Sequence, residues 1–92
     1  MSTEAAILKS LQTIPNIGKS MARDLYDLGY HKPEDLKGED PLKMYKQLCE
    51  KTKSRQDPCV LDTFMAAVHY ANTGEGKPWW EFTPERKRTF PV

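Results

Sequence analysis

The chain has 92 residues, of which 38% are hydrophobic and 29% are charged, and its formal net charge is +1. This length and composition predict one soluble globular domain with a modest core. Since no apolar run approaches about 18 residues and no charged-then-apolar start is present, we expect no membrane span, no secretory signal and a cytoplasmic location. The near-neutral charge excludes extensive electrostatic contact with a duplex, so any DNA binding is expected to be local, weak or shared with a partner.

The first elements along the chain are two short helices joined by a hairpin. Ser2 or Thr3 can cap a helix over residues 4–12. Residues 14–18 predict a tight turn, because they include a proline without an N–H, an asparagine that tolerates left-handed backbone and a glycine. A second amphipathic helix follows and ends at Gly29, in the position of a C-terminal cap.

The start of this second helix is the candidate binding site. The first amide groups of a helix have no partner within it, and Gly18 lets an outside group approach them. Such a position suits an anion, and phosphate is the commonest one in a cell. Lys19 and Arg23, four residues apart, can add positive charge beside it.

Three further helices are predicted from prolines at helix starts. A short helix is expected over residues 33–36, and longer ones over residues 41–52 and 59–72, the last two capped by Asp40 and Asp57. The helix over residues 59–72 is apolar on more than one face, with Asp62 and His69 among its few interruptions, and is therefore expected at the centre of the fold.

A cluster of basic residues, Lys51, Lys53 and Arg55, follows the helix over residues 41–52. The first interpretation is a solvated helix end whose cations complement the helix dipole. The alternative joins these accessory basic side chains to Lys19 and Arg23 as one phosphate-facing stripe.

The segment after residue 77 is aromatic and then basic. Trp79, Trp80 and Phe82 are expected to fold back over the small core, with stacking on unpaired bases as the alternative. Residues 83–92 are expected to form a mobile C-terminal tail beyond a domain of residues 1–82, although Thr83-Pro84-Glu85 can start a last helical turn. The basic run of residues 86–88 is then either a mobile end or an electrostatic arm.

Catalytic and metal chemistry find little support in the residue types. The spacing of Cys49 and Cys59 is not that of a metal site, and we expect both to be reduced and buried, with a redox pair or metal site as the alternative. His69 is expected to be a half-buried packing or hydrogen-bonding residue, and His31 to be solvated. No nucleotide loop, activated nucleophile or suitably spaced carboxylate pair is seen, so we expect neither enzymatic activity nor a cofactor.

The hairpin Ile14-Pro15-Asn16-Ile17-Gly18, followed by Ala22, resembles the helix-hairpin-helix motif. The resemblance implies sequence-independent contacts to the DNA backbone, made largely by the main-chain amides of Gly18 and Ser20. It also implies a monovalent cation on the carbonyls of Gln12, Ile14 and Ile17. The phosphate-binding residues that follow from it are Asn16, Ile17, Gly18, Lys19, Ser20 and Arg23. The sequence departs from the motif at Asn16, which replaces a glycine, and at Ser20, where a basic residue is usual.

The resemblance extends from residue 7 to residue 80. Its segments are Leu28-Gly29-Tyr30, Pro33-Glu34-Asp35-Leu36, Asp40-Pro41, Leu48-Cys49-Glu50, Arg55 to Asp62, Phe64, Ala66-Ala67-Val68 and Pro78-Trp79-Trp80. They are similar to the small bacterial "pathogenicity locus" family of helix-hairpin-helix proteins, some of which carry a mitomycin-resistance label. The N-terminal half is also similar to the C-terminal domain of TfoX-type competence regulators. These resemblances imply an all-α single domain of about five helices, of the helix-hairpin-helix or sterile-alpha-motif kind.

Two functions are consistent with these features. The first is a module that grips the DNA backbone without reading bases, as an accessory to repair, recombination or uptake. The alternative is a protein interaction domain of the sterile-alpha-motif kind that binds no DNA, which the near-neutral charge would suit.

Overall fold

Helices account for the regular structure of this protein, for which we describe residues 3–90 of a computed structural model. These residues form five α-helices and two short 3-10 helices and contain no strand, which confirms the predicted all-α single domain. The elements are α1 (Glu4–Leu11), α2 (Lys19–Asp27), η1 (Pro33–Leu36), α3 (Pro41–Thr52), α4 (Pro58–Thr73), η2 (Trp79–Phe82) and α5 (Thr83–Thr89).

Three of the helices begin at a side chain that caps their free amides. Thr3 accepts a hydrogen bond from the Ala6 amide at 3.2 Å, and Asp40 and Asp57 accept from the amides two residues later at 3.0 and 2.9 Å. A proline follows directly after each of the two aspartates, where its missing N–H costs no helix bond. Thr3 is therefore the observed cap of α1, whereas Ser2 lies outside the described residues.

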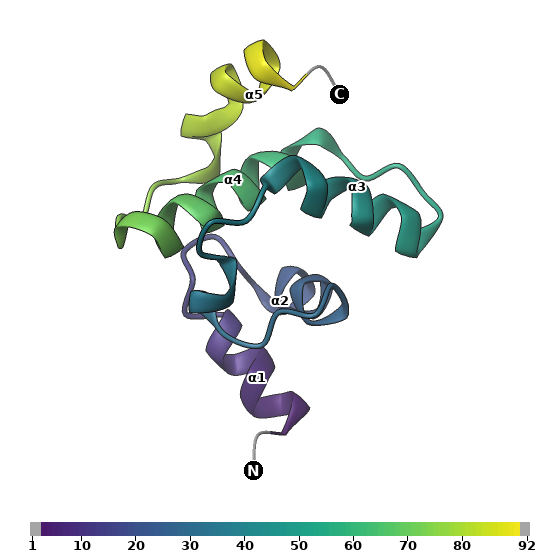
Figure 1. The fold of residues 1–92 in the computed structure, drawn as a ribbon, viewed down its shortest axis with the longest axis vertical. Helices are drawn as coiled ribbons and strands as arrows, with labels where there is room; N and C mark the ends of the chain where they lie inside the picture. Colours follow the sequence, from purple (N-terminus) through teal and green to yellow (C-terminus); the bar gives the residue numbers. More distant parts are fainter. Residues whose placement is uncertain (1–2, 91–92) are drawn as a thin grey trace.

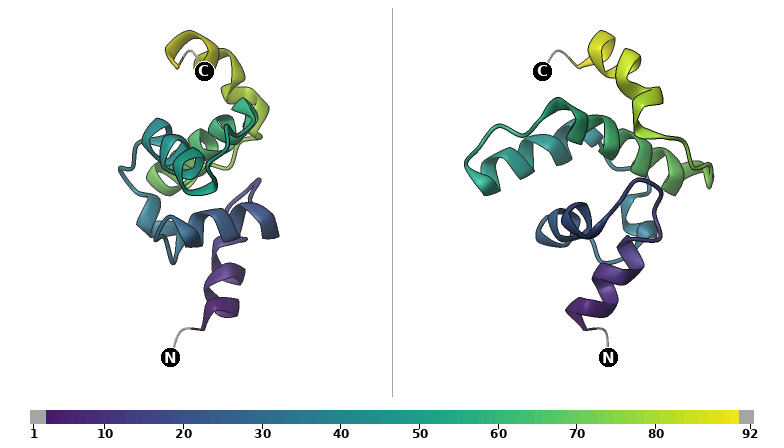
Figure 2. Two further views of the ribbon diagram at one scale, coloured as in Figure 1. Left: turned by 90° about the vertical axis from the view of Figure 1, so that its right-hand side faces the viewer. Right: turned by 180° about the vertical axis from the view of Figure 1, so that it is seen from behind.

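The elements lie in three tiers (Figure 1). α4 crosses the middle of the molecule with α3 beside it; α1, the hairpin, α2 and η1 lie on one side, and η2 and α5 lie on the other. Two further views show the same arrangement (Figure 2). The buried apolar core is shared by the tier of α3 and α4 and the tier of α1, the hairpin, α2 and η1. Its residues are Leu11, Ile14, Ile17, Ala22, Leu25, Leu36, Met44, Tyr45, Leu48, Leu61, Phe64, Met65, Ala67 and Val68.

α4 is the central helix, as its apolar sequence predicted. Every residue from Leu61 to Val68 is buried, because α3, η1, η2 and α5 all pack around it. Asp62 is among these buried residues, and its carboxylate accepts hydrogen bonds from the Thr83 hydroxyl at 2.6 Å and the Arg86 Nε at 2.7 Å. The buried carboxylate is thus paired by groups from α5.

The C-terminal segment differs from the tail expected from residue 83 onward. Thr83–Thr89 is α5, and the side chain of Arg86 is only 11% exposed because it reaches the buried Asp62. Arg86 therefore belongs neither to a mobile end nor to an electrostatic arm, whereas Lys87 and Arg88 are exposed. Residues 91–92 lie outside the part of the chain that the structure describes.

The two cysteines are half-buried, which differs from the full burial expected. Cys49 lies late in α3, where the Gln56 amide contacts its sulfur at 3.4 Å, and Cys59 lies in the first turn of α4. Desolvation raises the pKa of the Cys59 thiol, so the neutral form is favoured.

Within residues 3–90, no three His, Cys, Asp or Glu side chains gather as they would around a metal ion. No helix in that range has the length and apolar character needed to cross a bilayer.

Candidate nucleic-acid interface

Two isoleucines anchor the turn between α1 and α2 in the core. Ile14 is 1% exposed and Ile17 is 5% exposed, and the Ile17 amide donates to the Ile14 carbonyl at 3.2 Å. Between them, Asn16 has a φ of +73°, the left-handed conformation that the sequence predicted an asparagine could adopt there. Because both apolar side chains point inward, the backbone that follows them is left on the surface.

The start of α2 presents amide groups that the protein does not use. Gly18 is the N-terminal cap residue, with no side chain capping the helix, and the first helical bond runs from the Ala22 amide to the Gly18 carbonyl at 2.9 Å. No residue among 3–90 accepts a hydrogen bond from the amides of Gly18, Lys19, Ser20 or Met21. The first turn of α2 contains no acidic residue. This end of the helix is therefore suited to an anion.

Gly18 leaves open space where a side chain would stand at the start of α2. Its φ of −92° and ψ of −170° are extended backbone that other residues adopt, and a Cβ built there would meet no heavy atom within 4 Å. The side chains of Lys19 and Ser20 are exposed on the following turn. Neither backbone strain nor packing requires the glycine, and its effect is to keep the main chain accessible.

Loop 74–78, which follows α4, holds the outer side of the hairpin. The side-chain amide of Asn16 donates to the Lys77 carbonyl at 2.7 Å. A Cβ at Gly76 would lie 2.8 Å from Cγ of Pro15, so the backbone of Gly76 is close to the proline ring. Asn16 therefore positions the hairpin through its side chain, a role that its spacing in the sequence did not reveal.

His69 fixes the same loop to α4. Its Nε2 lies 2.8 Å from Oε1 of Glu75, and the Lys77 ammonium lies 3.5 Å from the same oxygen. The hydrogen bond with His69 and the charge of Lys77 lower the pKa of the Glu75 carboxyl. The His69 ring is half-buried and packs against Phe82 at 5.5 Å, in agreement with its predicted packing and hydrogen-bonding role.

Arg23 is engaged by carboxylates and does not stand free beside Lys19. Its guanidinium pairs with Glu4 of α1 and with Asp27 one turn later, at 3.4 Å, and lies 5.5 Å from the centre of the Tyr26 ring. Arg23 thus joins α2 to α1. Of the two cations predicted at this site, the structure leaves Lys19 next to the free amides.

The second basic cluster lies away from this site. Lys51 lines a shallow hollow of about 370 Å³ with Leu28, at the C-terminal end of α2, whereas Lys19 is at the other end of that nine-residue helix. At about 1.5 Å per residue, the two ends of α2 are about 13 Å apart. Lys53 ends α3 in the left-handed conformation, and Arg55 is exposed in the next loop. These positions fit the interpretation of cations at a helix C-terminus.

The carbonyls implied for a monovalent cation lie in the turn before Gly18. The Ile14 carbonyl already accepts a hydrogen bond from the Ile17 amide. No donor among residues 3–90 forms a hydrogen bond with the carbonyls of Gln12 and Ile17. Oxygen donors of this kind are those that hard cations take. The turn therefore keeps carbonyl lone pairs that such an ion would use.

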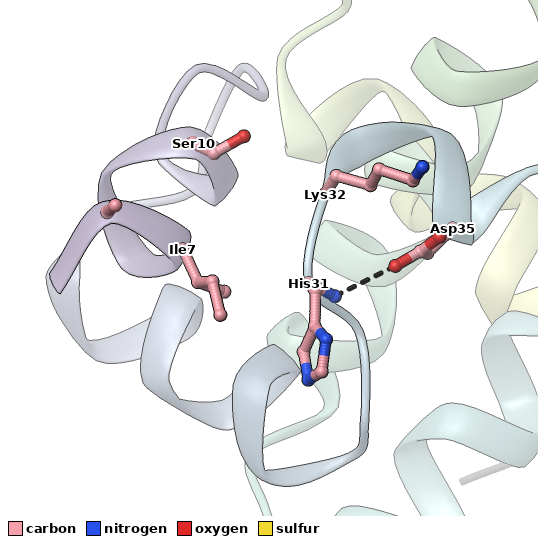
Figure 3. Close-up of a pocket in the computed structure, with 6 residues that line it drawn as sticks. Ile7, Ser10, His31, Lys32 and Asp35 are labelled. Carbon is pink, nitrogen blue, oxygen red and sulfur yellow. Dashed lines mark hydrogen bonds between the residues drawn. The ribbon is translucent and has the colours of Figure 1, made fainter. Parts of the chain in front are cut away.

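A separate hollow of about 410 Å³ lies between α1 and the segment that leads into η1 (Figure 3). Its walls come from Ala6, Ile7, Ser10, His31, Lys32 and Asp35. The His31 amide donates to Asp35 at 2.9 Å, and the exposed His31 ring lies 5.7 Å from Tyr26. None of the predicted phosphate-binding residues lines this hollow.

Comparison with known proteins assigns the chain to a family. The family model described as Cdd1, pathogenicity locus, matches residues 4–88. The chain belongs to the pathogenicity locus family. It is 41% identical over 78 residues to the mitomycin resistance protein McrB of Streptomyces lavendulae, an alignment that covers 85% of this chain and 74% of that protein. No solved structure matches the chain significantly.

The region shared with the pathogenicity locus family includes everything that shapes the hairpin. The match begins at the first residue of α1 and extends past Arg86 in α5. It therefore covers the free amides of α2, loop 74–78 and the buried Asp62–Arg86 pair. The family resemblance seen in the sequence is confirmed.

Proposed function

We propose that this pathogenicity locus protein binds the DNA backbone without reading base sequence. The observation that carries the proposal is the start of α2, where the amides of Gly18, Lys19 and Ser20 have no acceptor among residues 3–90, Gly18 presents no side chain, and Lys19 is exposed. Backbone amides at a helix start are anion donors, and phosphate contacts carry no base information. The role that fits is a binding accessory, without catalysis, in DNA repair, recombination or uptake.

The substitution Gly18→Asp separates binding from folding. The extended backbone at residue 18 is that of a capping residue, and a Cβ there meets nothing within 4 Å. The new carboxylate would accept hydrogen bonds from the free amides of α2, so the free energy of unfolding is expected to stay the same or rise. The same carboxylate would occupy and repel the phosphate position, so duplex affinity at about 50 mM salt should fall at least about tenfold.

The matched control is Ser54→Asp, which adds the same charge in the exposed loop after α3. It should leave both stability and DNA affinity close to those of the wild type. If Gly18→Asp binds labelled duplex as the wild type does, or if the wild type shows no binding at high micromolar concentration, the proposed function is wrong.

Lys19→Glu tests whether the contact is independent of sequence. We expect an equal loss of affinity on AT-rich and GC-rich duplexes and a shallower salt dependence, because a phosphate contact is removed. Lys53→Glu, the same charge change at the end of α3, should have little effect. Unequal losses between the two duplexes would count against the proposal.

The alternative is a protein interaction module of the sterile-alpha-motif kind. A net charge of +1 favours it, because dedicated duplex-binding proteins of this size are usually much more basic. Failure of the duplex titration, combined with concentration-dependent self-association in size measurements, would support this function.

A further inference from the structure

Trp80 is a large apolar side chain that the fold leaves in contact with water. It is 60% exposed, although Thr83 and Arg86, which follow it, are fixed to the buried Asp62. Its ring packs edge-on against the half-buried Trp79, with 5.7 Å between the ring centres. The indole is therefore presented on a fixed support, and tryptophans presented in this way are typical anchors of protein interfaces.

A negative charge lies next to this indole. Glu81 follows Trp80 directly, is exposed and forms no ion pair within residues 3–90. The other charge within three residues of Trp80 is Lys77, which already pairs with Glu75. We call Trp80 and Glu81 the η2 surface. Two copies of the η2 surface would bring like charges together, so a positively charged partner suits it better than the same surface of another copy.

Positive charge is concentrated on α3 and the loop after it. Residues 43–55 contain five basic residues and one acidic residue, whereas the rest of the chain contains nine basic and twelve acidic residues. None of the four lysines in this stretch forms an ion pair within residues 3–90. The one acidic residue, Glu50, has lysines four positions before it and three positions after it. The net charge of +1 therefore conceals a basic region on an otherwise acidic chain.

Two shallow hollows of about 370 Å³ each adjoin on α3, since Gln47 and Glu50 line both. Their other lining residues are Leu28 and Lys51 in the first, and Asp40, Leu42, Lys43 and Lys46 in the second. Leu28 and Leu42 are half-buried, so each hollow offers an apolar contact beside lysines. We call the residues that line these two hollows the α3 surface.

We infer that the η2 surface of one copy docks on the α3 surface of a second copy, with the Trp80 indole in a hollow and Glu81 beside the lysines. A second copy is the partner because one chain carries both complementary surfaces, on separate elements (Figure 1). Contact between two different surfaces is heterologous, so copies can add to one another in a chain or a ring. The surfaces are small, so each contact is expected to be weak, with a dissociation constant between micromolar and millimolar.

Light scattering over a range of protein concentrations tests this inference. The average mass of the wild type should rise towards millimolar concentration, and rise less at high salt, because salt screens the charges. Trp80→Ala should weaken association about thirtyfold or more, the scale of a lost interface anchor. Lys46→Glu should weaken it at least about tenfold, because Glu81 would then meet a negative charge. Lys9→Glu, the same charge change on α1, should have little effect.

A mixture of the two variants distinguishes a heterologous contact from a symmetric one. Trp80→Ala keeps an intact α3 surface, and Lys46→Glu keeps an intact η2 surface. The mixture should therefore form a one-to-one dimer that grows no further, although each variant alone stays largely monomeric. The replaced side chains are exposed, so both variants should melt close to the wild-type temperature.

The outcomes are separate from those of the proposed function. A wild type that stays monomeric up to millimolar concentration overturns the inference, and so does association that Trp80→Ala leaves unchanged or a mixture that forms no dimer. The start of α2 belongs to neither surface, and these measurements contain no DNA. The result of Gly18→Asp on DNA binding therefore stands whichever way self-association turns out.

Discussion

Asp62 shows how a single residue determines where the C-terminal segment lies. Its side chain is 1% exposed inside the buried part of α4, and its oxygens accept hydrogen bonds from Thr83 and Arg86. The ion pair with Asp62 raises the pKa of Arg86, so the guanidinium stays charged. Breaking one member of a buried pair leaves the other without compensation, which is costlier than removing both.

We expect Asp62→Ala to lower the free energy of unfolding by about 3–5 kcal/mol, because Arg86 would remain buried and unpaired. The double variant Asp62→Leu with Arg86→Met should recover most of this loss, since it removes both charges at similar volume. Urea unfolding of the wild type, the single variants and the double variant measures the coupling. Additive losses in the double variant would show that the two groups act independently.

Gly76 makes the tightest contact between loop 74–78 and the hairpin. A Cβ there would lie 2.8 Å from Cγ of the Pro15 ring, which cannot rotate away. We expect Gly76→Ala to destabilise the fold by about 1–3 kcal/mol, the cost of overpacking. In a Pro15→Ala background the same change should cost much less, as a double-mutant cycle in urea would show. An equal cost in both backgrounds would place the strain elsewhere.

At the scale of elements, the aspartate that caps α4 makes stability depend on pH. Hydrogen bonds from Cys59, chiefly from its amide, lower the pKa of Asp57 in the folded state. A carboxyl whose folded pKa lies below its unfolded value stabilises the fold above its ordinary pKa, and this stability is lost as pH falls. Asp57 therefore contributes to acid sensitivity at the start of α4.

Asp57→Asn keeps a capping acceptor but removes the titration. We expect its urea midpoint to fall less than that of the wild type as the pH is lowered from about 5 to about 2. Glu75→Gln, which removes the other carboxyl with a lowered pKa, should flatten the same part of the curve. Parallel curves for wild type and Asp57→Asn would exclude the cap as a source of acid sensitivity.

The sequence predicted the elements because their starts and stops are local. The aspartate-proline pairs at residues 40–41 and 57–58 and the glycines at 29 and 74 mark helix ends without reference to the rest of the chain. Packing within an element was less predictable. Met44, for example, is 1% exposed, although the pattern over residues 41–52 predicts Leu42, Tyr45, Leu48 and Cys49 as the inward-facing residues.

Contacts between distant residues could not be predicted from local pattern. An aspartate inside an apolar helix indicates that some partner exists, but nothing in the sequence identifies Arg86 as that partner. The pairing of Arg23 with Glu4 likewise depends on how α1 and α2 cross. At the candidate site, the exposed glycine and its free amides followed from the hairpin, whereas the contact between Asn16 and Lys77 depends on the tertiary fold.

At the scale of the whole molecule, charge limits how DNA can be held. The net charge is +1, Arg23 and Arg86 are paired with carboxylates, and Lys51 lies by the C-terminal end of α2. Under the proposed function, Lys19 is the predicted cation that lies beside the free amides, so affinity depends on a small number of backbone contacts.

We expect a shallow salt dependence for duplex binding. With two or three phosphates neutralised, a plot of log affinity against log salt should have a slope of about −2 to −3. Fluorescence anisotropy over about 25–200 mM salt measures it, and Lys19→Glu should reduce the slope by about one. A slope of about −5 or steeper would require basic contacts beyond those near α2.

The hydrogen bond from Asn16 to Lys77 joins residues 61 positions apart. During synthesis, the N-terminal hairpin therefore leaves the ribosome long before the loop that completes it. A chain cut short before residue 76 would retain α1, the hairpin and α2 yet lack both contacts that hold the outer side of the hairpin. A fragment that contains only these two helices is thus not an equivalent of the native protein.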